Sequence, residues 1–179
     1  MRVVLIGYRG SGKSVVGRLV ADRLGLAFVD TDLEIETRDG RSIAEIFAED
    51  GELGFRKVER DVIADVSRRQ RVVIAAGGGA VLDPDTRSDW TASDTLVAWL
   101  TATPEELAGR ISGDETTADR RPSLTGRSVL EEITEVLRHR EPLYRDCQRL
   151  TIDTTGRTIE DVAAEIVTSV MSADPGQED

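Results

Sequence analysis

The segment from Gly7 to Ser14 contains the residues with the clearest chemical use. It reads Gly-Tyr-Arg-Gly-Ser-Gly-Lys-Ser and completes the pattern G-x-x-x-x-G-K-[ST] directly after an apolar run at 3–6. Glycines let backbone N–H groups turn inward around phosphate oxygens, at the positive end of the helix that follows. Lys13 would then reach the β- and γ-phosphates, and the Ser14 hydroxyl would bind the accompanying Mg²⁺. The segment predicts a site for a nucleoside triphosphate, and an ordinary strand, turn and helix is the alternative.

Two carboxylates follow the second apolar run, in Asp30-Thr31-Asp32. In a parallel α/β sheet, ligands gather beyond the carboxyl ends of the strands, where the phosphate loop also opens. Asp30 could hold a Mg²⁺-bound water, and Asp32 could orient, or accept a proton from, a hydroxyl that attacks the γ-phosphate. Either residue could instead only cap the next helix.

Further candidates for the site come from three later segments of the chain. Gly77-Gly78-Gly79 follows the third apolar run and offers bare backbone to a ligand, or else forms a loose turn. Arg56, with Glu59 one turn away, could hold a carboxylate or form an ordinary surface ion pair. Arg121 and Arg140 could stabilise charge on a phosphoryl group or bind an anion, and solvated surface arginines are the alternative.

The composition limits the classes of function. Among 179 residues, 34 acidic and 23 basic side chains give a net charge of -11, which repels nucleic-acid phosphates. Cys147 is the only cysteine, so an intramolecular disulfide or a cysteine-rich metal site is excluded, and we expect this side chain to be buried. The sequence shows neither a signal-peptide pattern nor an apolar run long enough to span a membrane. We therefore expect a cytoplasmic protein, monomeric, with small anionic ligands and without nucleic-acid or membrane partners.

Apolar runs alternate with amphipathic segments along the chain, which predicts a parallel α/β sheet within one domain over 1–171. The strands are expected at 3–6, 26–29, 72–76, 95–100 and 149–152, and the helices at 13–24, 31–38, 43–49, 52–68, 104–111, 128–141 and 158–172. The stretch 112–127 is polar and rich in glycine and proline. It predicts a mobile lid over the site, or else a plain disordered insertion. We expect the polar tail at 172–179 to be disordered.

Taken together, these segments resemble the shikimate kinase family, a small branch of the phosphate-loop kinases. The similarity spans nearly the whole chain, and the joint pattern is far more specific than the phosphate loop alone. The segments that carry it are Gly7 to Ser14, Asp30-Thr31-Asp32, Gly40-Arg41-Ser42-Ile43, Gly54-Phe55-Arg56-Lys57-Val58-Glu59, Gly77-Gly78-Gly79, Arg121-Pro122, Arg140-x-Pro142-Leu143-Tyr144 and Asp153.

The resemblance implies a three-layer α/β/α phosphate-loop kinase fold, with a five-stranded parallel sheet in the order 2-3-1-4-5, a mobile lid and a moving substrate-binding segment around 31–60. It implies transfer of the γ-phosphate of ATP to the 3-hydroxyl of shikimate, with Mg²⁺, on the route to chorismate and the aromatic amino acids. On the acceptor side, the implied shikimate-binding residues are Asp32, Arg56, Gly77, Gly78, Gly79 and Arg140. On the donor side, the implied nucleotide-binding residues are Gly10, Ser11, Gly12, Lys13, Ser14, Val15, Arg110, Arg121 and Arg157. The resemblance also implies that Ser14 and Asp30 lie beside the metal, and that Asp32, Lys13 and Arg121 are the catalytic groups.

Two departures from the family pattern bear on these expectations. The lid is longer than usual, which leaves open whether Arg120 or Arg121 is the functional arginine, and we choose Arg121 because it directly precedes a proline. Val15 stands where serine or threonine is common. Two other functions stay open: a kinase of another small hydroxylated acid such as gluconate, and a regulatory module that binds nucleotide and metabolite without turnover.

Overall fold

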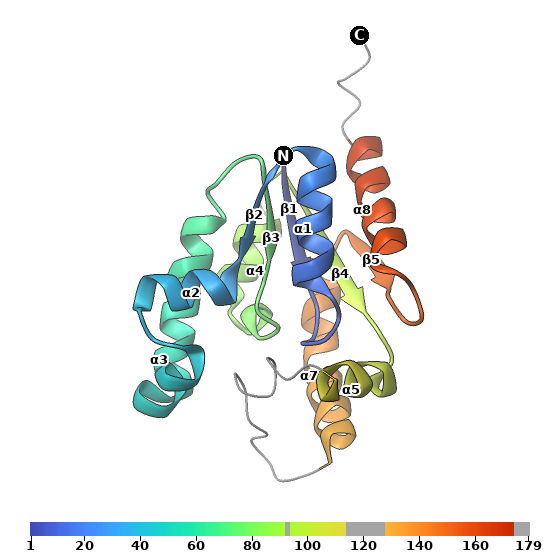
Figure 1. The fold of residues 1–179 in the computed structure, drawn as a ribbon. Coiled ribbons are helices and arrows are strands. Elements are labelled where there is room, and N and C mark those ends of the chain that lie inside the picture. The colour runs from blue at the N-terminus through green and yellow to red at the C-terminus, as the bar shows by residue number, and fades with distance from the viewer. Residues whose placement is uncertain (92–93, 114–127, 174–179) are drawn as a thin grey trace.

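The computed structural model describes residues 1–91, 94–113 and 128–173. Its centre is a single parallel sheet in the order β2-β3-β1-β4-β5, which confirms the predicted topology (Figure 1). The strands are β1 (Arg2–Ile6), β2 (Ala27–Asp30), β3 (Val72–Ala75), β4 (Thr95–Thr101) and β5 (Leu150–Asp153). The three inner strands are nearly continuous apolar runs because helices cover both of their faces.

Alternate residues of β1 belong to two different cores, which defines the three layers. Val3 and Leu5 pack with α1 (Lys13–Leu24) and α8 (Ile159–Ala173) on one face of the sheet. Val4 and Ile6 pack on the other face with α3 (Ile43–Val66), α4 (Pro84–Thr91) and α7 (Val129–Cys147). Successive side chains of a strand point to opposite faces, so one short strand anchors both layers. Cys147 is buried in the second core, as expected.

The remaining elements surround the carboxyl ends of the strands. α2 (Thr31–Asp39) follows β2 directly, and α5 (Pro104–Ser112) follows β4. A short 3₁₀ helix, η1 (Ala80–Leu82), follows the glycines after β3. A third, smaller core joins α5 and α7 around Tyr8, Leu107 and Ile133. The phosphate loop is thereby held between the sheet and the α5–α7 pair (Figure 1).

Several boundaries differ from the predicted ones. η1 and α4 were not expected. α7 was predicted to end at residue 141 but continues through Pro142 to Cys147, because Tyr144 and Cys147 extend its buried face. The two helices expected at 43–49 and 52–68 are the two arms of α3, which is broken by the non-helical backbone of Gly51. α8 continues to Ala173, so the predicted disordered tail starts too early, and 174–179 lie outside the described residues.

Most of the predicted lid, 114–127, also lies outside the described residues, together with Arg120 and Arg121. Ser112 ends α5 and Gly113 caps it. Within the described part of the chain, none of the helices is both long enough and apolar enough to cross a membrane.

Candidate active site

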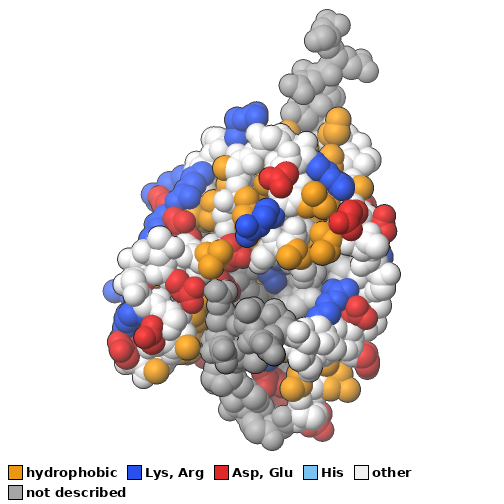
Figure 2. Space-filling model, in the orientation of Figure 1, with side chains coloured by type: hydrophobic (Ala, Val, Ile, Leu, Met, Phe, Trp, Pro, Cys, Tyr) orange, Lys and Arg blue, Asp and Glu red, His pale blue; other side chains and the backbone are white. Residues whose placement is uncertain are grey.

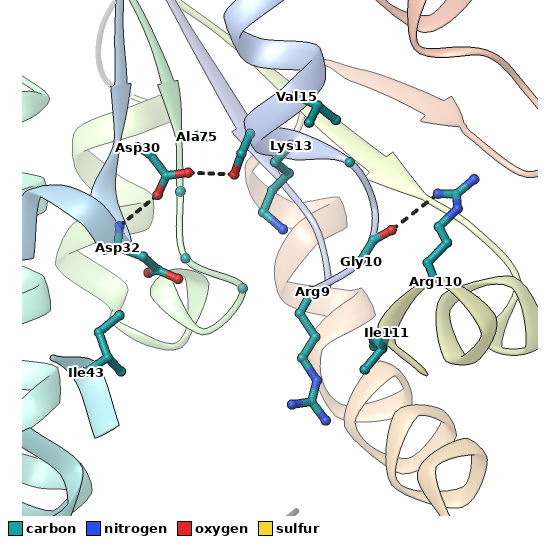
Figure 3. A pocket seen from close by; sticks show the side chains of 15 residues that line it. Arg9, Gly10, Lys13, Val15, Asp30, Asp32, Ile43, Ala75, Arg110 and Ile111 are labelled. Carbon is teal, nitrogen blue, oxygen red and sulfur yellow. Dashed lines mark hydrogen bonds between the residues drawn. The ribbon is translucent and has the colours of Figure 1, made fainter. Parts of the chain in front are cut away.

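A cavity of about 370 Å³ opens at the carboxyl ends of β1, β2 and β3, a size typical of small-molecule sites. Figure 3 shows Asp32 and Ile43 on one side of it, Gly10 and Arg110 on the other, and Lys13 between them. The lining residues come from the phosphate loop, the start of α2 and α3, the glycines after β3, and α5: Arg9, Gly10, Gly12, Lys13, Ser14, Val15, Asp30, Asp32, Ile43, Ala75, Ala76, Gly77, Gly78, Arg110 and Ile111.

The phosphate loop has a backbone that side chains would disturb. Gly12 caps the N-terminus of α1 with φ 92°, in the left-handed region. Gly7 has φ 141°, and a Cβ atom there would collide with the carbonyl oxygen of Leu100 in β4. The loop can therefore lie tightly against the sheet while the first turn of α1 points its N–H groups at the cavity.

Lys13 lies inside this loop and is only 9% exposed. Its Nζ donates to the carbonyl oxygens of Gly7 at 2.9 Å and Tyr8 at 2.8 Å. The ammonium is thus held on the inner side of the loop, where it lines the cavity. A fixed positive charge at this point suits the β- and γ-phosphates of a nucleotide.

Ser14 and Asp30, the two residues predicted beside the metal, are hydrogen-bonded to each other. The Ser14 hydroxyl donates to Asp30 Oδ2 at 2.5 Å, while Asp30 Oδ1 accepts from the Asp32 backbone N–H at 3.0 Å (Figure 3). Asp30 therefore does cap α2, and its second oxygen still faces the phosphate loop. The two oxygens match the hard ligands that Mg²⁺ prefers. No cluster of three or more Asp, Glu, His or Cys side chains suited to a metal occurs in the described ranges.

Asp32 lies at the start of α2, half-buried against the glycine turn. A Cβ atom on Gly77 would lie 2.7 Å from Asp32 Oδ1 and 2.9 Å from Glu59 Oε1. The Gly77 N–H donates to the buried hydroxyl of Thr31 at 2.9 Å, which fixes the turn against α2. A side chain at position 77 would thus displace the carboxylates of Asp32 and Glu59.

Arg56 is held by a buried carboxylate, although the sequence left open whether this pair is an ordinary surface ion pair. Glu59 is only 3% exposed, and its Oε2 accepts from Arg56 Nη1 at 2.5 Å. Glu52 accepts from Arg56 Nη2 at 3.2 Å. Burial by itself lowers the pKa of Arg56, but the charges and hydrogen bonds of Glu59 and Glu52 outweigh it, so the pKa is raised and the guanidinium stays charged. A Cβ atom on Gly79 would collide with this guanidinium, so a side chain there would displace Arg56 from its present position.

Arg140 and Tyr144 lie one turn apart on α7 and bind the same atom. Arg140 Nη1 donates to the Gly78 carbonyl oxygen at 3.1 Å, and the Tyr144 hydroxyl donates to it at 2.6 Å. Tyr144 is fully buried, and burial raises the pKa of its phenol to about 12, so it remains a donor at neutral pH. These two side chains hold the middle glycine of the turn. Tyr144 was part of the family pattern, but its contact with Gly78 was not predicted.

A second, smaller cavity of about 200 Å³ adjoins the outer side of the phosphate loop. Arg110 and Arg157 both line it, together with Val15 and Ile159. Arg110 lines both cavities and donates to the carbonyl oxygens of Gly10 at 3.3 Å and Thr154 at 2.8 Å. The structure therefore brings Arg110 and Arg157 to one place beside the loop.

The predicted residues fall into three groups by their position. The larger cavity is lined by Gly10, Gly12, Lys13, Ser14, Val15, Asp30, Asp32, Gly77, Gly78 and Arg110, and the smaller one is also lined by Ser11 and Arg157. Gly79 ends the glycine turn, Arg56 and Arg140 contact the turn, and none of these three residues lines the larger cavity. Arg121 lies outside the described residues. Arg9 also lines the cavity, held by Glu132 of α7 at 3.2 Å, although the loop pattern leaves its position unspecified.

The comparisons with known proteins decide the family. The family model for shikimate kinase matches residues 9–171. The chain belongs to the shikimate kinase family. A shikimate kinase from Rhodopirellula baltica is 48% identical over 94% of this chain and 90% of its own length. One from Symbiobacterium thermophilum is 43% identical over 93% of this chain and 94% of its own.

Solved structures give the same result at the level of the fold. The shikimate kinase from Acinetobacter baumannii, solved in complex with shikimate, has a TM-score of 0.89 at 32% identity, covering 97% of this chain and 94% of its own. A gluconokinase from Sinorhizobium meliloti has a TM-score of 0.56 at 16% identity, covering 96% of this chain and 92% of its own. At that identity the gluconokinase shows only a common fold, whereas the shikimate kinase family is shown by sequence and structure together.

Proposed function

We propose that this shikimate kinase family member transfers the γ-phosphate of ATP to the 3-hydroxyl of shikimate, giving shikimate 3-phosphate and ADP on the route to the aromatic amino acids. One observation carries the proposal: the Asp32 carboxylate and the Lys13 ammonium line the same cavity, with Asp32 on one side of it and Lys13 in its middle. A hydroxyl acceptor needs the first and a triphosphate donor needs the second.

The step balances with groups of this chain. Asp32 accepts the proton of the 3-hydroxyl of shikimate while the oxygen of that hydroxyl forms a bond to the γ-phosphorus of ATP. At the same time the bond between the γ-phosphorus and the bridging oxygen of the leaving ADP breaks. Lys13 stabilises the negative charge on the phosphoryl oxygens, and the N–H groups of Gly10 to Val15 surround them. Catalysis of this kind depends mainly on positioning and on fixed charges.

The acceptor's carboxylate is assigned to Arg56 and Arg140, around the glycine turn 77–79. Both guanidinium groups are part-buried and held by protein acceptors, which limits the freedom they lose on binding an anion. The second cavity, between Arg110 and Arg157, is assigned to the adenine side of ATP. Ser14 and Asp30 would hold Mg²⁺, which neutralises phosphate charge when bound. Arg121 is proposed as a further positive charge that binds the phosphates. We also propose that the protein is cytoplasmic and monomeric.

The reaction is tested by ADP release at fixed ATP and Mg²⁺, with shikimate, with gluconate and without an acceptor. We expect release that depends on shikimate and yields shikimate 3-phosphate. Release that gluconate supports with the larger specificity constant would show a different acceptor. Tight binding of ATP and shikimate without turnover would show a sensor in place of an enzyme.

Replacing Arg140 with alanine should chiefly weaken shikimate binding. A charged hydrogen bond contributes about 1.5–3 kcal/mol, which predicts a KM for shikimate raised roughly 10- to 150-fold with a KM for ATP near the wild-type value. Steady-state kinetics with each substrate varied in turn measure both constants.

Tyr144→Phe is the matched control, because it removes the other donor to the Gly78 carbonyl without removing a charge. If Arg140 binds the acceptor's carboxylate, Tyr144→Phe should change the KM for shikimate less than threefold. Equal effects of the two variants would mean that Arg140 acts only by holding Gly78 in place.

A further inference from the structure

Arg41 lies in the turn between α2 and α3, outside the cavity, and forms ion pairs with three carboxylates. Its Nε and Nη2 bind the two oxygens of Asp39 at 2.6 and 3.1 Å, in a two-pronged contact. Nη1 binds Glu49 at 2.7 Å, and Nη2 also binds Asp50 at 2.7 Å. These hydrogen bonds, with Asp39 contributing most, raise the pKa of Arg41 above its ordinary value and lower that of Asp39.

The carboxylates that Arg41 joins all precede a structural break inside α3, at Gly51. Asp39 ends α2, whereas Glu49 and Asp50 end the first arm of α3. The next residue is Gly51, with φ 69° and ψ -174°, a backbone conformation that essentially only glycine adopts. Arg41 therefore binds the first arm of α3 immediately before its direction changes.

Asp50, which Arg41 binds, also contacts the second arm of α3. A Cβ atom on Gly54 would collide with the Asp50 Cβ atom, so the backbone of the second arm packs directly on the side chain that Arg41 holds. The rings of Phe47 and Phe55 also stack across the break, with centroids 4.5 Å apart. One residue after the buried Phe55 comes Arg56.

We propose that Arg41 is a positioning residue for the acceptor site: it fixes the break of α3 at Gly51 and thereby the place of Arg56. This role rests on the proposed function, in which Arg56 binds the carboxylate of shikimate. Without Arg41 the carboxylates of Asp39, Glu49 and Asp50 would repel one another, and the end of the first arm, on which the second arm packs, would lose this restraint. Isolated exposed ion pairs contribute little, but this one is a network with a two-pronged contact and connects three segments. Figure 2 shows acidic and basic side chains interspersed over the α2–α3 part of the surface.

The test is the affinity for shikimate in the full-length protein, measured by isothermal titration calorimetry for the wild type, Arg41→Gln and Arg41→Lys. We expect Arg41→Gln to weaken shikimate binding about 5- to 20-fold. This loss of affinity is smaller than, or close to, the smallest loss expected when a charged hydrogen bond to the ligand itself is removed. The KM for shikimate should rise in parallel, with kcat and the KM for ATP changed less than twofold. Arg41→Lys should recover part of the affinity, because it keeps a positive charge among the three carboxylates.

Arg38→Gln is the matched control. Arg38 is 37% exposed, near the 31% of Arg41, and also binds two carboxylates, Glu34 and Asp65, but it does not contact the residues before Gly51. It should leave shikimate binding within twofold of the wild type. The proposal is wrong if Arg41→Gln also binds shikimate within twofold of the wild type, or if Arg38→Gln weakens binding equally. Failure of the wild type itself to bind shikimate would instead overturn the proposed function, and this proposal with it.

Discussion

Replacing Asp32 with asparagine is expected to lower kcat about 10²- to 10⁴-fold, the range in which a positioned general base contributes. Asparagine has the shape of aspartate, so it should fit the space beside Gly77 without moving the glycine turn. It cannot accept the proton of the acceptor hydroxyl. The affinity for ATP should stay within about twofold of the wild type, because Asp32 lies on the acceptor side of the cavity, across from the phosphate loop.

Asp30→Asn provides the control, since it makes the same chemical change two residues earlier. An asparagine at 30 can still cap α2, but it removes charge beside Ser14. We expect this variant to need more Mg²⁺ and to regain turnover as Mg²⁺ is raised. The deficit of Asp32→Asn should persist at every Mg²⁺ concentration. Single-turnover measurements of phosphoryl transfer would contradict the role of Asp32 if they gave a wild-type-like rate for that variant.

The apolar runs located all five strands to within one residue at each end, because strands buried between two helical layers are continuous apolar segments. Their order did not follow from periodicity. It came from the resemblance to a family, and the sheet confirms it. Local patterns contain no information on which strands pair when every connection is a helical crossover.

α4 was missed because it offers almost no apolar periodicity. Its buried residues are Thr86 and Trp90, four positions apart, and the residues around them are polar. The far end of α7 was missed for a different reason. Proline removes one backbone hydrogen bond and normally ends a helix, but the packing of Tyr144 and Cys147 in the core outweighs that loss here.

At the site, residue types could be predicted but contacts could not. The glycines at 77–79 were interpreted as access for a ligand, and the structure shows that a Cβ atom on Gly77 or Gly79 would also displace the side chains of Asp32, Glu59 or Arg56. A glutamate three residues after an arginine on a helix is usually a solvated partner, so nothing in the sequence marked Glu59 as buried. Its burial depends on the glycine turn, which is close to α3 in space and distant from it in the chain.

Replacing Lys13 with methionine is expected to lower kcat about 10²- to 10³-fold, the effect of removing one fixed donor to the charge of a transition state. Methionine fills most of the space of the lysine stem, so the change isolates the loss of the ammonium. The carbonyl groups of Gly7 and Tyr8 also lose their donor, which should lower the free energy of unfolding by about 1–3 kcal/mol. Turnover and urea denaturation would be measured on the same preparation, at a temperature where the variant is fully folded.

Lys57 is the only other lysine of the chain, and it is exposed on α3, so Lys57→Met controls for the loss of a lysine charge. It should leave both turnover and stability near the wild type. If Lys13→Met turned over within tenfold of the wild type, the ammonium would serve the loop alone. Phosphate stabilisation would then have to come from the loop N–H groups and the surrounding arginines. A large loss of turnover with a small loss of stability is the result that assigns Lys13 to the reaction, because the two carbonyl contacts alone would affect folding and leave the rate per folded molecule unchanged.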